Sequence, residues 1–104
     1  MVIKVSVFYP SGPKKHFDME YYCTRHIPLV QKLCGAALQS VSVEQGIAGG
    51  TPGSVPSFAA MGHLVFESVE TFQASFGPNM NEIVADVPNY TNIQPEIQIS
   101  EIKL

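Results

Sequence analysis

Hydrophobic and polar residues alternate along four stretches of the chain, and this alternation predicts four β-strands. The stretches are residues 1–9, 38–45, 58–66 and 96–104. In the third stretch the alternation places five residues on one face, namely Phe58, Ala60, Gly62, Leu64 and Phe66. In the last stretch the apolar positions change face after Ile99, which predicts a β-bulge near residues 100–101 or a strand buried on both faces.

Residues 17–35 show the i, i+3, i+4 spacing of a helix with one apolar face. Asp18 is expected to cap its first turn, and Gly35 follows its last one. Pro28 removes one backbone hydrogen bond, so we expect the helix to kink or split near Thr24. The predicted apolar face consists of Met19, Tyr22, Cys23, His26, Leu29, Val30 and Leu33.

A second helical segment follows Ser68, a good N-cap residue, and is interrupted at Gly77 and Pro78. Its apolar positions are Val69, Phe72, Phe76, Met80, Ile83, Val84 and Val87. Two segments without periodicity are predicted to be loops: residues 46–57, which are rich in glycine, and residues 88–95, which are mostly polar and bounded by prolines.

The order of the predicted elements is β-α-β-β-α-β, which favours an α+β fold of the ferredoxin-like type. In this fold a four-stranded antiparallel sheet carries both helices on one face. The 104 residues are expected to form one domain. The open sheet face carries Phe8 and other apolar side chains mixed with polar ones, so we expect it to pack on a second copy as a dimeric α+β barrel.

The composition supports a covered surface and excludes some partners. Only 14% of the residues are charged, against roughly 25% in an average protein. A net charge of −3 and six scattered basic residues argue against nucleic-acid binding. The sequence shows neither a signal-like start nor an apolar run long enough to span a membrane, so we expect a cytoplasmic protein. Cys23 and Cys34 are too far apart on one helix to pair, which predicts free thiols.

His26 is the first candidate for chemistry, because it is a polar ring at the centre of a predicted core-facing surface. One interpretation is a buried histidine that is hydrogen-bonded to a carbonyl group or a tyrosine. The other is a general acid or base, because an imidazole titrates near neutral pH. Tyr22, one turn earlier on the same face, supports the second interpretation.

Asp86 is the second candidate, because an aspartate near a helix C-terminus is disfavoured by the helix dipole. It is either solvated or directed inward, where it needs a partner such as His26 or a tyrosine. Asn89 and Tyr90 follow in the loop and add an amide and a phenol that can reach the same pocket, although such residues between prolines also belong to ordinary turns.

The other chemistry-bearing residues give weaker signals. His63 lies within a predicted strand, where a core or dimer-interface position is expected, and His16 is expected to be exposed. The three histidines lack the spacing of a metal site, and no glycine-rich loop resembles a nucleotide-binding motif. Both cysteines fall on the predicted buried side, which argues against a nucleophilic thiol. We therefore expect neither a metal nor a cofactor.

The sequence resembles the EthD family, which is named for a protein associated with ethyl tert-butyl ether degradation. The resemblance rests on Tyr9-Pro10, on Phe17-Asp18 with Tyr21-Tyr22 and His26-Ile27-Pro28-Leu29-Val30, on Phe66-Glu67-Ser68 with Phe72 and Phe76, and on Ala85-Asp86-Val87-Pro88-Asn89-Tyr90-Thr91. It implies a dimeric α+β barrel. Relatives of that barrel include cofactor-free monooxygenases, isomerases, dehydratases and decarboxylases. The resemblance therefore implies a role in small-molecule catabolism but no particular reaction.

These observations give three hypotheses. The first is cofactor-independent acid/base chemistry on a small, apolar, oxygenated substrate, of the isomerase, dehydratase, decarboxylase or oxygenase type. His26 acts as acid or base, Asp86 orients it, and Tyr90 or Asn89 polarises a ligand oxygen. The second is a non-catalytic dimer that binds a small molecule or a partner enzyme in the same cleft, and the third is a structural domain without a cavity. The expected ligand contacts between sheet and helices are Tyr9, Tyr22, Met61, Phe72 and Phe76.

Overall fold

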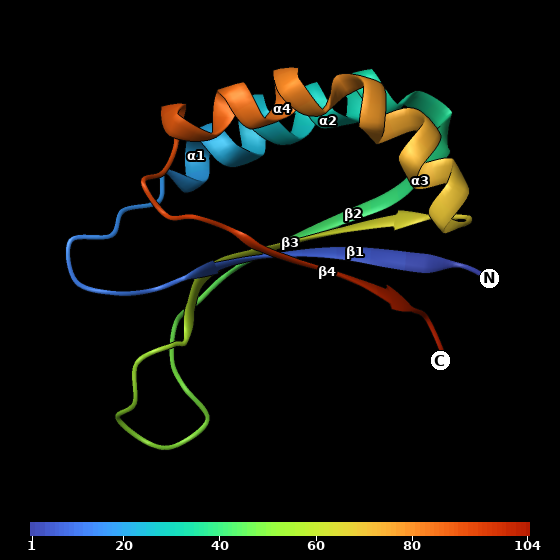
Figure 1. Ribbon diagram of the computed structural model, residues 1–104. Coiled ribbons are helices and arrows are strands. Elements are labelled where there is room, and N and C mark those ends of the chain that lie inside the picture. Colours follow the sequence, from blue (N-terminus) through green and yellow to red (C-terminus); the bar gives the residue numbers. More distant parts are fainter.

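The computed structural model describes all 104 residues and contains one antiparallel sheet with helices on one face (Figure 1). The strands occur in the order β2-β3-β1-β4 across the sheet, and every neighbouring pair is antiparallel. This arrangement confirms the predicted ferredoxin-like fold class. The strand bounds are β1 Ile3–Pro10, β2 Leu38–Gln45, β3 Phe58–Phe66 and β4 Glu96–Glu101.

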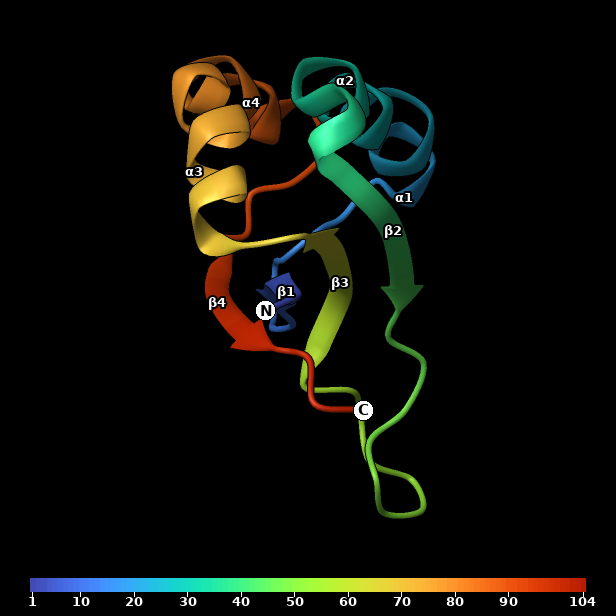
Figure 2. The same ribbon diagram turned by 90° about the vertical axis from the view of Figure 1, so that its right-hand side faces the viewer.

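The helices form a single layer above the sheet, with α2 beside α4 (Figure 2). The first helical segment consists of α1 (Met19–Tyr21), a π-helical turn (Tyr22–His26) and α2 (Ile27–Cys34). The second consists of α3 (Val69–Phe76) and α4 (Met80–Asp86), joined by the 3-10 turn Gly77–Asn79. None of these helices has both the length and the apolar character that a membrane span requires.

The predicted helix ends are confirmed. The Asp18 carboxylate accepts a hydrogen bond from the Tyr21 N–H at 3.0 Å, and the Ser68 hydroxyl accepts one from the Thr71 N–H at 3.0 Å. These bonds satisfy N–H groups that have no partner within the helix. Gly35 ends α2 with φ +61°, a left-handed conformation that favours glycine.

The expected distortion by Pro28 is a π-helical turn. The N–H of Ile27 donates to the carbonyl of Tyr22, five residues earlier, and the next residue, Pro28, has no N–H. The wide turn contains one more residue than an α-helical turn. This extra residue explains why the prediction for Cys23 was wrong: its side chain is exposed, whereas Ile27 takes a buried position.

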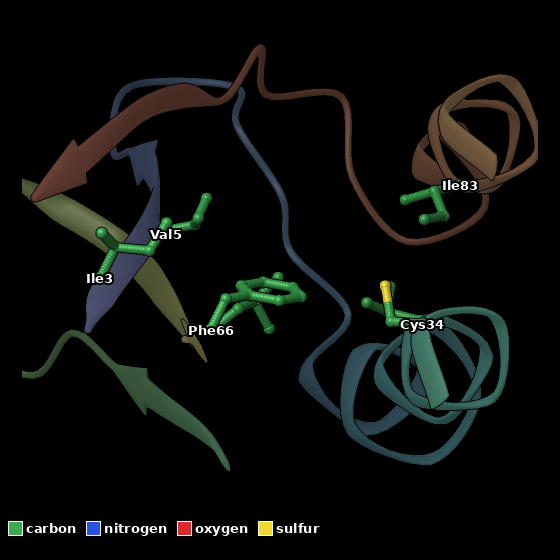
Figure 3. Close-up of a cluster of buried hydrophobic side chains, with 7 residues drawn as sticks. Ile3, Val5, Cys34, Phe66 and Ile83 are labelled. Atoms are coloured by element: carbon green, nitrogen blue, oxygen red, sulfur yellow. The ribbon is translucent and has the colours of Figure 1, made fainter. Parts of the chain in front are cut away.

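A hydrophobic cluster joins the sheet to both helical segments at one end of the molecule (Figure 3). Side chains from β1, β3, α2 and α4 point toward one another in this cluster. Its buried members are Ile3, Val5, Val30, Cys34, Leu64, Phe66 and Ile83. A second buried cluster lies toward the other end and is rich in tyrosine: Tyr9, Tyr22, Ile27, Ala60, Tyr90 and Ile93.

Two predictions about the strands were wrong, and one about a loop was incomplete. Phe58 packs on Phe8, which lies on the open sheet face, with ring centroids 5.2 Å apart, because the β1–β3 register shifts near Pro10. β4 pairs with β1 without a shift and ends at Glu101, so the apolar residues beyond it need no bulge. The segment 88–95 is not simply a polar loop, because Tyr90, Thr91 and Ile93 within it are buried.

Candidate active site

A cavity of ≈ 130 Å³ lies between the sheet and the helices. Its floor is formed by β1 and β3, including Val7, Tyr9 and Gly62. Its other walls come from the first helical segment, from α4 and from the segment that leads into β4. The lining is almost entirely hydrophobic, and His26 is the one residue in it whose side chain can titrate near neutral pH.

The cavity opens at the edge of the molecule between α4 and β4. Three of its lining side chains are well exposed there: Met80 by 47%, Val84 by 57% and Ile97 by 62%. Figure 2 shows α4 above the edge of the sheet that β4 forms. We call these three residues the mouth. Other residues of the same lining are buried, namely His26, Tyr22 and Tyr90. A molecule from the solvent would therefore meet the mouth before it reaches them.

His26 and Asp86 form a direct pair, with 2.9 Å between Nδ1 and Oδ2. The π-helical turn directs His26 inward, and Asp86 reaches it from the end of α4. The imidazole is stacked on Tyr22 with ring centroids 5.5 Å apart, and it also contacts the ring of Tyr90 at 4.6 Å. Packing from both aromatic neighbours therefore fixes the plane of the imidazole.

Asp86 accepts two further hydrogen bonds on its other oxygen. The Tyr21 hydroxyl donates to Oδ1 at 2.7 Å, and the Asn89 side-chain amide donates to the same atom at 3.0 Å. Burial raises the pKa of Asp86, but hydrogen bonds from Asn89, Tyr21 and His26 outweigh burial and hold the pKa below its ordinary value. The bond to the Asp86 carboxylate is also the main cause that raises the pKa of Tyr21. Asp86 is thus a carboxylate that only accepts hydrogen bonds.

The charge on Asp86 determines which nitrogen of His26 carries the proton. Burial lowers the pKa of His26 below 6.5, and the neighbouring carboxylate only partly offsets this effect. The neutral ring must donate from Nδ1 to Asp86, which leaves the lone pair on Nε2. Nε2 has no hydrogen-bond partner in the protein, whereas every fully buried side-chain nitrogen or oxygen has one. Nε2 is therefore not fully buried, and His26 is one of the residues that line the cavity.

Three tyrosines surround the inner end of the cavity. The hydroxyls of Tyr9 and Tyr90 are hydrogen-bonded at 2.8 Å, and Tyr22 packs against both rings. Burial raises the pKa of each phenol well above its ordinary value. All three remain neutral donors at physiological pH. The mutual bond of Tyr9 and Tyr90 uses only one of their two hydroxyl hydrogens.

Gly62 makes room for Tyr22. A Cβ atom at position 62 would collide with the Tyr22 hydroxyl, which lies against the backbone of β3. The Tyr22 ring in turn supports the imidazole of His26. A glycine in the middle of a strand thus sets the position of the catalytic candidate on the opposite wall.

The structure brings most of the sequence candidates together. His26, Tyr90, Tyr9, Tyr22 and Phe76 line the cavity, and Asp86 contacts His26 from outside it. The three remaining candidates do not line it. Met61 pairs with Phe8 and lies on the other face of the sheet, Phe72 packs on Phe66 in the core, and Asn89 is exposed and contacts Asp86 instead of the cavity.

Sequence reasoning missed two features of this site. Tyr21 was not a candidate, although it directly precedes Tyr22 and binds Asp86. The mouth was also not predicted, because Met80, Val84 and Ile97 looked like ordinary core positions of a helix and a strand. The exposed fraction of these residues depends on how far α4 lies from the sheet edge, which sequence spacing does not encode.

His63 lies on the open face of the sheet and not in the cavity. Its Nδ1 is 2.8 Å from the Ser6 hydroxyl, and its Nε2 is 3.0 Å from a carboxylate oxygen of Glu44. Both ring nitrogens are therefore engaged by the protein. No group of three histidine, cysteine, aspartate or glutamate side chains is placed to hold a metal ion.

The family model that describes the EthD domain matches residues 14–94. The crystal structure of an EthD-like protein from Ralstonia eutropha JMP134 is similar over 99% of this chain and 93% of that chain, with 42% identity and a TM-score of 0.95. No curated protein matches the sequence.

Two more distant structures share the fold alone. SnoaB, a cofactor-independent oxygenase from Streptomyces nogalater, is 8% identical with a TM-score of 0.62, covering 99% of this chain and 93% of its own. A dimeric ferredoxin-like protein of unknown function from Thermobifida fusca YX is 11% identical with a TM-score of 0.59, covering 98% and 92%. The matched domain spans both candidate segments, from the first helical segment with His26 to the loop that follows Asp86, and this chain belongs to the EthD family.

Proposed function

We propose that the protein is a cofactor-independent acid/base catalyst for a small, apolar, oxygenated molecule. The observation that carries this proposal is that His26, a residue of the lining of an apolar cavity, has its Nδ1 held by the Asp86 carboxylate and its Nε2 without a protein partner. A base needs a lone pair that reaches the substrate, and a fixed tautomer supplies it. The supporting carboxylate stabilises the imidazolium that forms when the base takes a proton.

The reaction begins when Nε2 removes a proton from a carbon next to a substrate carbonyl group. The electron pair of the broken C–H bond moves toward the carbonyl oxygen. The phenol pair of Tyr9 and Tyr90 donates a hydrogen bond to that oxygen and stabilises its developing charge. His26 then returns the proton to a different carbon, which completes an isomerisation. Alternatively, the imidazolium of His26 donates this proton to a β-hydroxyl group, whose C–O bond breaks; the hydroxyl leaves as water, which completes a dehydration.

An oxygenase reaction follows the same first step. The deprotonated substrate is electron-rich and must itself transfer an electron to dioxygen, since the proposal includes no cofactor. SnoaB, which has the same fold, is a cofactor-independent oxygenase. The likeness to SnoaB concerns the fold alone, so the proposal for this chain rests on its own candidate base, His26, beside an apolar cavity.

We also propose that the protein works as a homodimer joined through the open sheet face. Phe8, Phe58, Met61 and Val65 lie on this face and are only partly buried. A structure of the same fold is a dimeric ferredoxin-like protein. Apolar side chains on an exposed sheet favour a partner that removes them from water. The cavity lies on the other side of the sheet, so the dimer leaves the mouth free.

Exchange of carbon-bound hydrogen for deuterium tests the catalytic proposal without knowledge of the natural substrate. A panel of neutral cyclic ketones and lactones is incubated with the protein in D2O, and loss of the α-proton signal is followed by NMR. The wild-type protein should accelerate exchange for at least one compound. The variant His26→Gln should lose this acceleration, whereas the matched control His63→Gln should retain it.

The same experiment separates catalysis from binding alone. If a compound binds the wild type and His26→Gln equally and exchange is never faster than in buffer, the protein is a small-molecule-binding member of the fold and the catalytic proposal is wrong. The almost fully apolar lining of the cavity suits that second function as well.

A further inference from the structure

The cavity that His26 lines shares several lining residues with a second depression on the surface, which we call the outer groove. Val84, Val87, Pro95 and Ile97 line both the cavity and the groove. The groove then follows the segment that leads into β4, past Thr91 and Ile93. The groove therefore begins at two residues of the mouth, Val84 and Ile97.

Neither the cavity nor the outer groove is lined by a charged side chain. Apart from His26, which is held neutral, the cavity lining contains no residue that ionises near pH 7. The outer groove contains only apolar, hydroxyl, amide and proline residues. An ionised group on the ligand would lose its hydration and gain no partner, which is strongly unfavourable. The ligand is therefore neutral along the whole length that the protein contacts.

The size of the cavity limits which part of the ligand it holds. Its volume is ≈ 130 Å³, whereas an engineered cavity of about 150 Å³ in another protein holds a single benzene ring. The groups able to bind oxygen, His26 and the tyrosine hydroxyls, all lie at the inner end. A ligand larger than one ring must place its oxygen function inside and extend its apolar remainder through the mouth.

We propose that the outer groove binds the apolar tail of a neutral amphiphile whose oxygenated head lies against His26. Met80, Val84 and Ile97 are exposed at the mouth although they are large and apolar, and a tail that crosses them would cover this surface. The substrate class is thus a neutral ketone, lactone or phenol with an apolar extension longer than the cavity. This inference rests on the proposed function for the placement of the head.

A series of methyl ketones of increasing chain length tests the groove directly. Binding of 2-butanone, 2-octanone and 2-undecanone is measured by NMR titration, with no need for turnover. Each methylene group that becomes buried should raise the affinity about fourfold, and the increase should continue past the length that fills the cavity. Decanoate, which carries a charge on a chain of similar length, should bind far more weakly than 2-undecanone.

Two matched variants locate the tail. Ile97→Thr changes a residue of the mouth, whereas Ile99→Thr changes the same residue type two positions further on the same face of β4, where it lines neither cavity nor groove. Ile97→Thr should weaken binding of 2-undecanone about tenfold and leave 2-butanone unchanged. Ile99→Thr should change neither. Both positions are well exposed, so the substitutions leave the core intact.

Three results would overturn the inference. The first is an affinity that stops rising at the chain length that fills the cavity. The second is equal binding of decanoate and 2-undecanone. The third is a change of oligomeric state in Ile97→Thr without a loss of ketone affinity, because the mouth would then be covered by a second copy. His26→Gln should keep the dependence on chain length, so a failure of the catalytic proposal leaves this test unaffected.

Discussion

His26 and His63 each contact a carboxylate at about 3 Å, yet they differ in whether the other ring nitrogen has a hydrogen-bond partner. His26 binds Asp86 through Nδ1, its Nε2 has no protein partner, and the residue lines the cavity. His63 uses one nitrogen for Ser6 and the other for Glu44, so its ring has no free lone pair to offer. A histidine–carboxylate pair is therefore not by itself a catalytic signature. The informative feature is an unpaired nitrogen beside a space that a ligand can occupy.

The surroundings of the two histidines depend on two consecutive residues of β3. Gly62 and His63 are consecutive in β3, and their side-chain positions point to opposite faces. Gly62 faces the helices and admits the Tyr22 hydroxyl, whereas His63 faces the open side. Neighbouring substitutions should thus affect different sites, and this contrast can be tested.

The largest difference should come from removal of the two carboxylates. Asp86→Ala leaves the buried His26 without its partner and should lower the free energy of unfolding by about 1.5–3 kcal/mol. Glu44→Ala removes a partner whose side chain is 51% exposed, and it should cost only about 0.2–1 kcal/mol. Urea denaturation of both variants gives the comparison, and equal losses would show that the two pairs are equivalent after all.

The next effect concerns the support of His26 from β3. Gly62→Ala should force the Tyr22 hydroxyl away from the strand and destabilise the protein by about 1–3 kcal/mol. The double variant Gly62→Ala/Tyr22→Phe lacks the colliding oxygen and should recover part of that loss. Thermal unfolding measures both. A double variant as unstable as the sum of the single changes would argue against this contact.

A smaller effect is expected for the buried hydroxyl pair. Tyr9→Phe removes one member of the Tyr9–Tyr90 hydrogen bond and should cost about 0.5–1.5 kcal/mol. Because the two tyrosines share that bond, adding Tyr90→Phe should cost less than it does in the wild-type background. Ser6→Ala on the open face is the matched control, since adding it to Tyr9→Phe should give a simple sum. Denaturant titrations of the single and double variants decide between coupling and independence.

Acidification should produce the smallest change in stability, and His26 should account for its first part. The pKa of His26 is lowered by folding, so the unfolded state takes up the proton first and stability falls as the pH drops below about 6.5. Asp86 also has a lowered pKa and adds a second loss at lower pH, near its ordinary value of 3.8. In His26→Gln the first loss should shrink. If the slope between pH 7 and pH 5 stays the same in this variant, His26 is not the group responsible.

The fold was largely predictable because it depends on local patterns. Strict alternation identified β2 and β3 with their observed bounds, and side-chain capping identified the first helix at Asp18. Predictions that needed exact counting failed where the backbone departs from its regular repeat. Cys23 is exposed because the π-helical turn contains an extra residue, and Phe58 changes face because the β1–β3 register shifts near Pro10.

The site was predictable only in part. The sequence identified His26 and Asp86 but did not determine whether they meet, because their contact depends on how α4 packs beside α2. Met61 and Phe72 were expected in the cavity because they are large and apolar, yet one lies below the sheet and the other in the core. Hydrophobicity indicates that a side chain is buried but does not indicate against which neighbours.

The π-helical turn before Pro28 also constrains how the chain can change in length. If regular α-helix replaced the π-helical turn, one residue fewer would be needed between the cap at Asp18 and the end at Gly35. Deleting an exposed residue of the turn, such as Thr24, would let it close into regular α-helix and would keep Ile27 and Val30 in the core. His26 would then follow Tyr22 by three residues instead of four, which changes how its imidazole meets the Tyr22 ring and the Asp86 carboxylate. The extra residue thus allows His26 and Ile27 to be buried side by side, and the candidate base depends on it more than the core does.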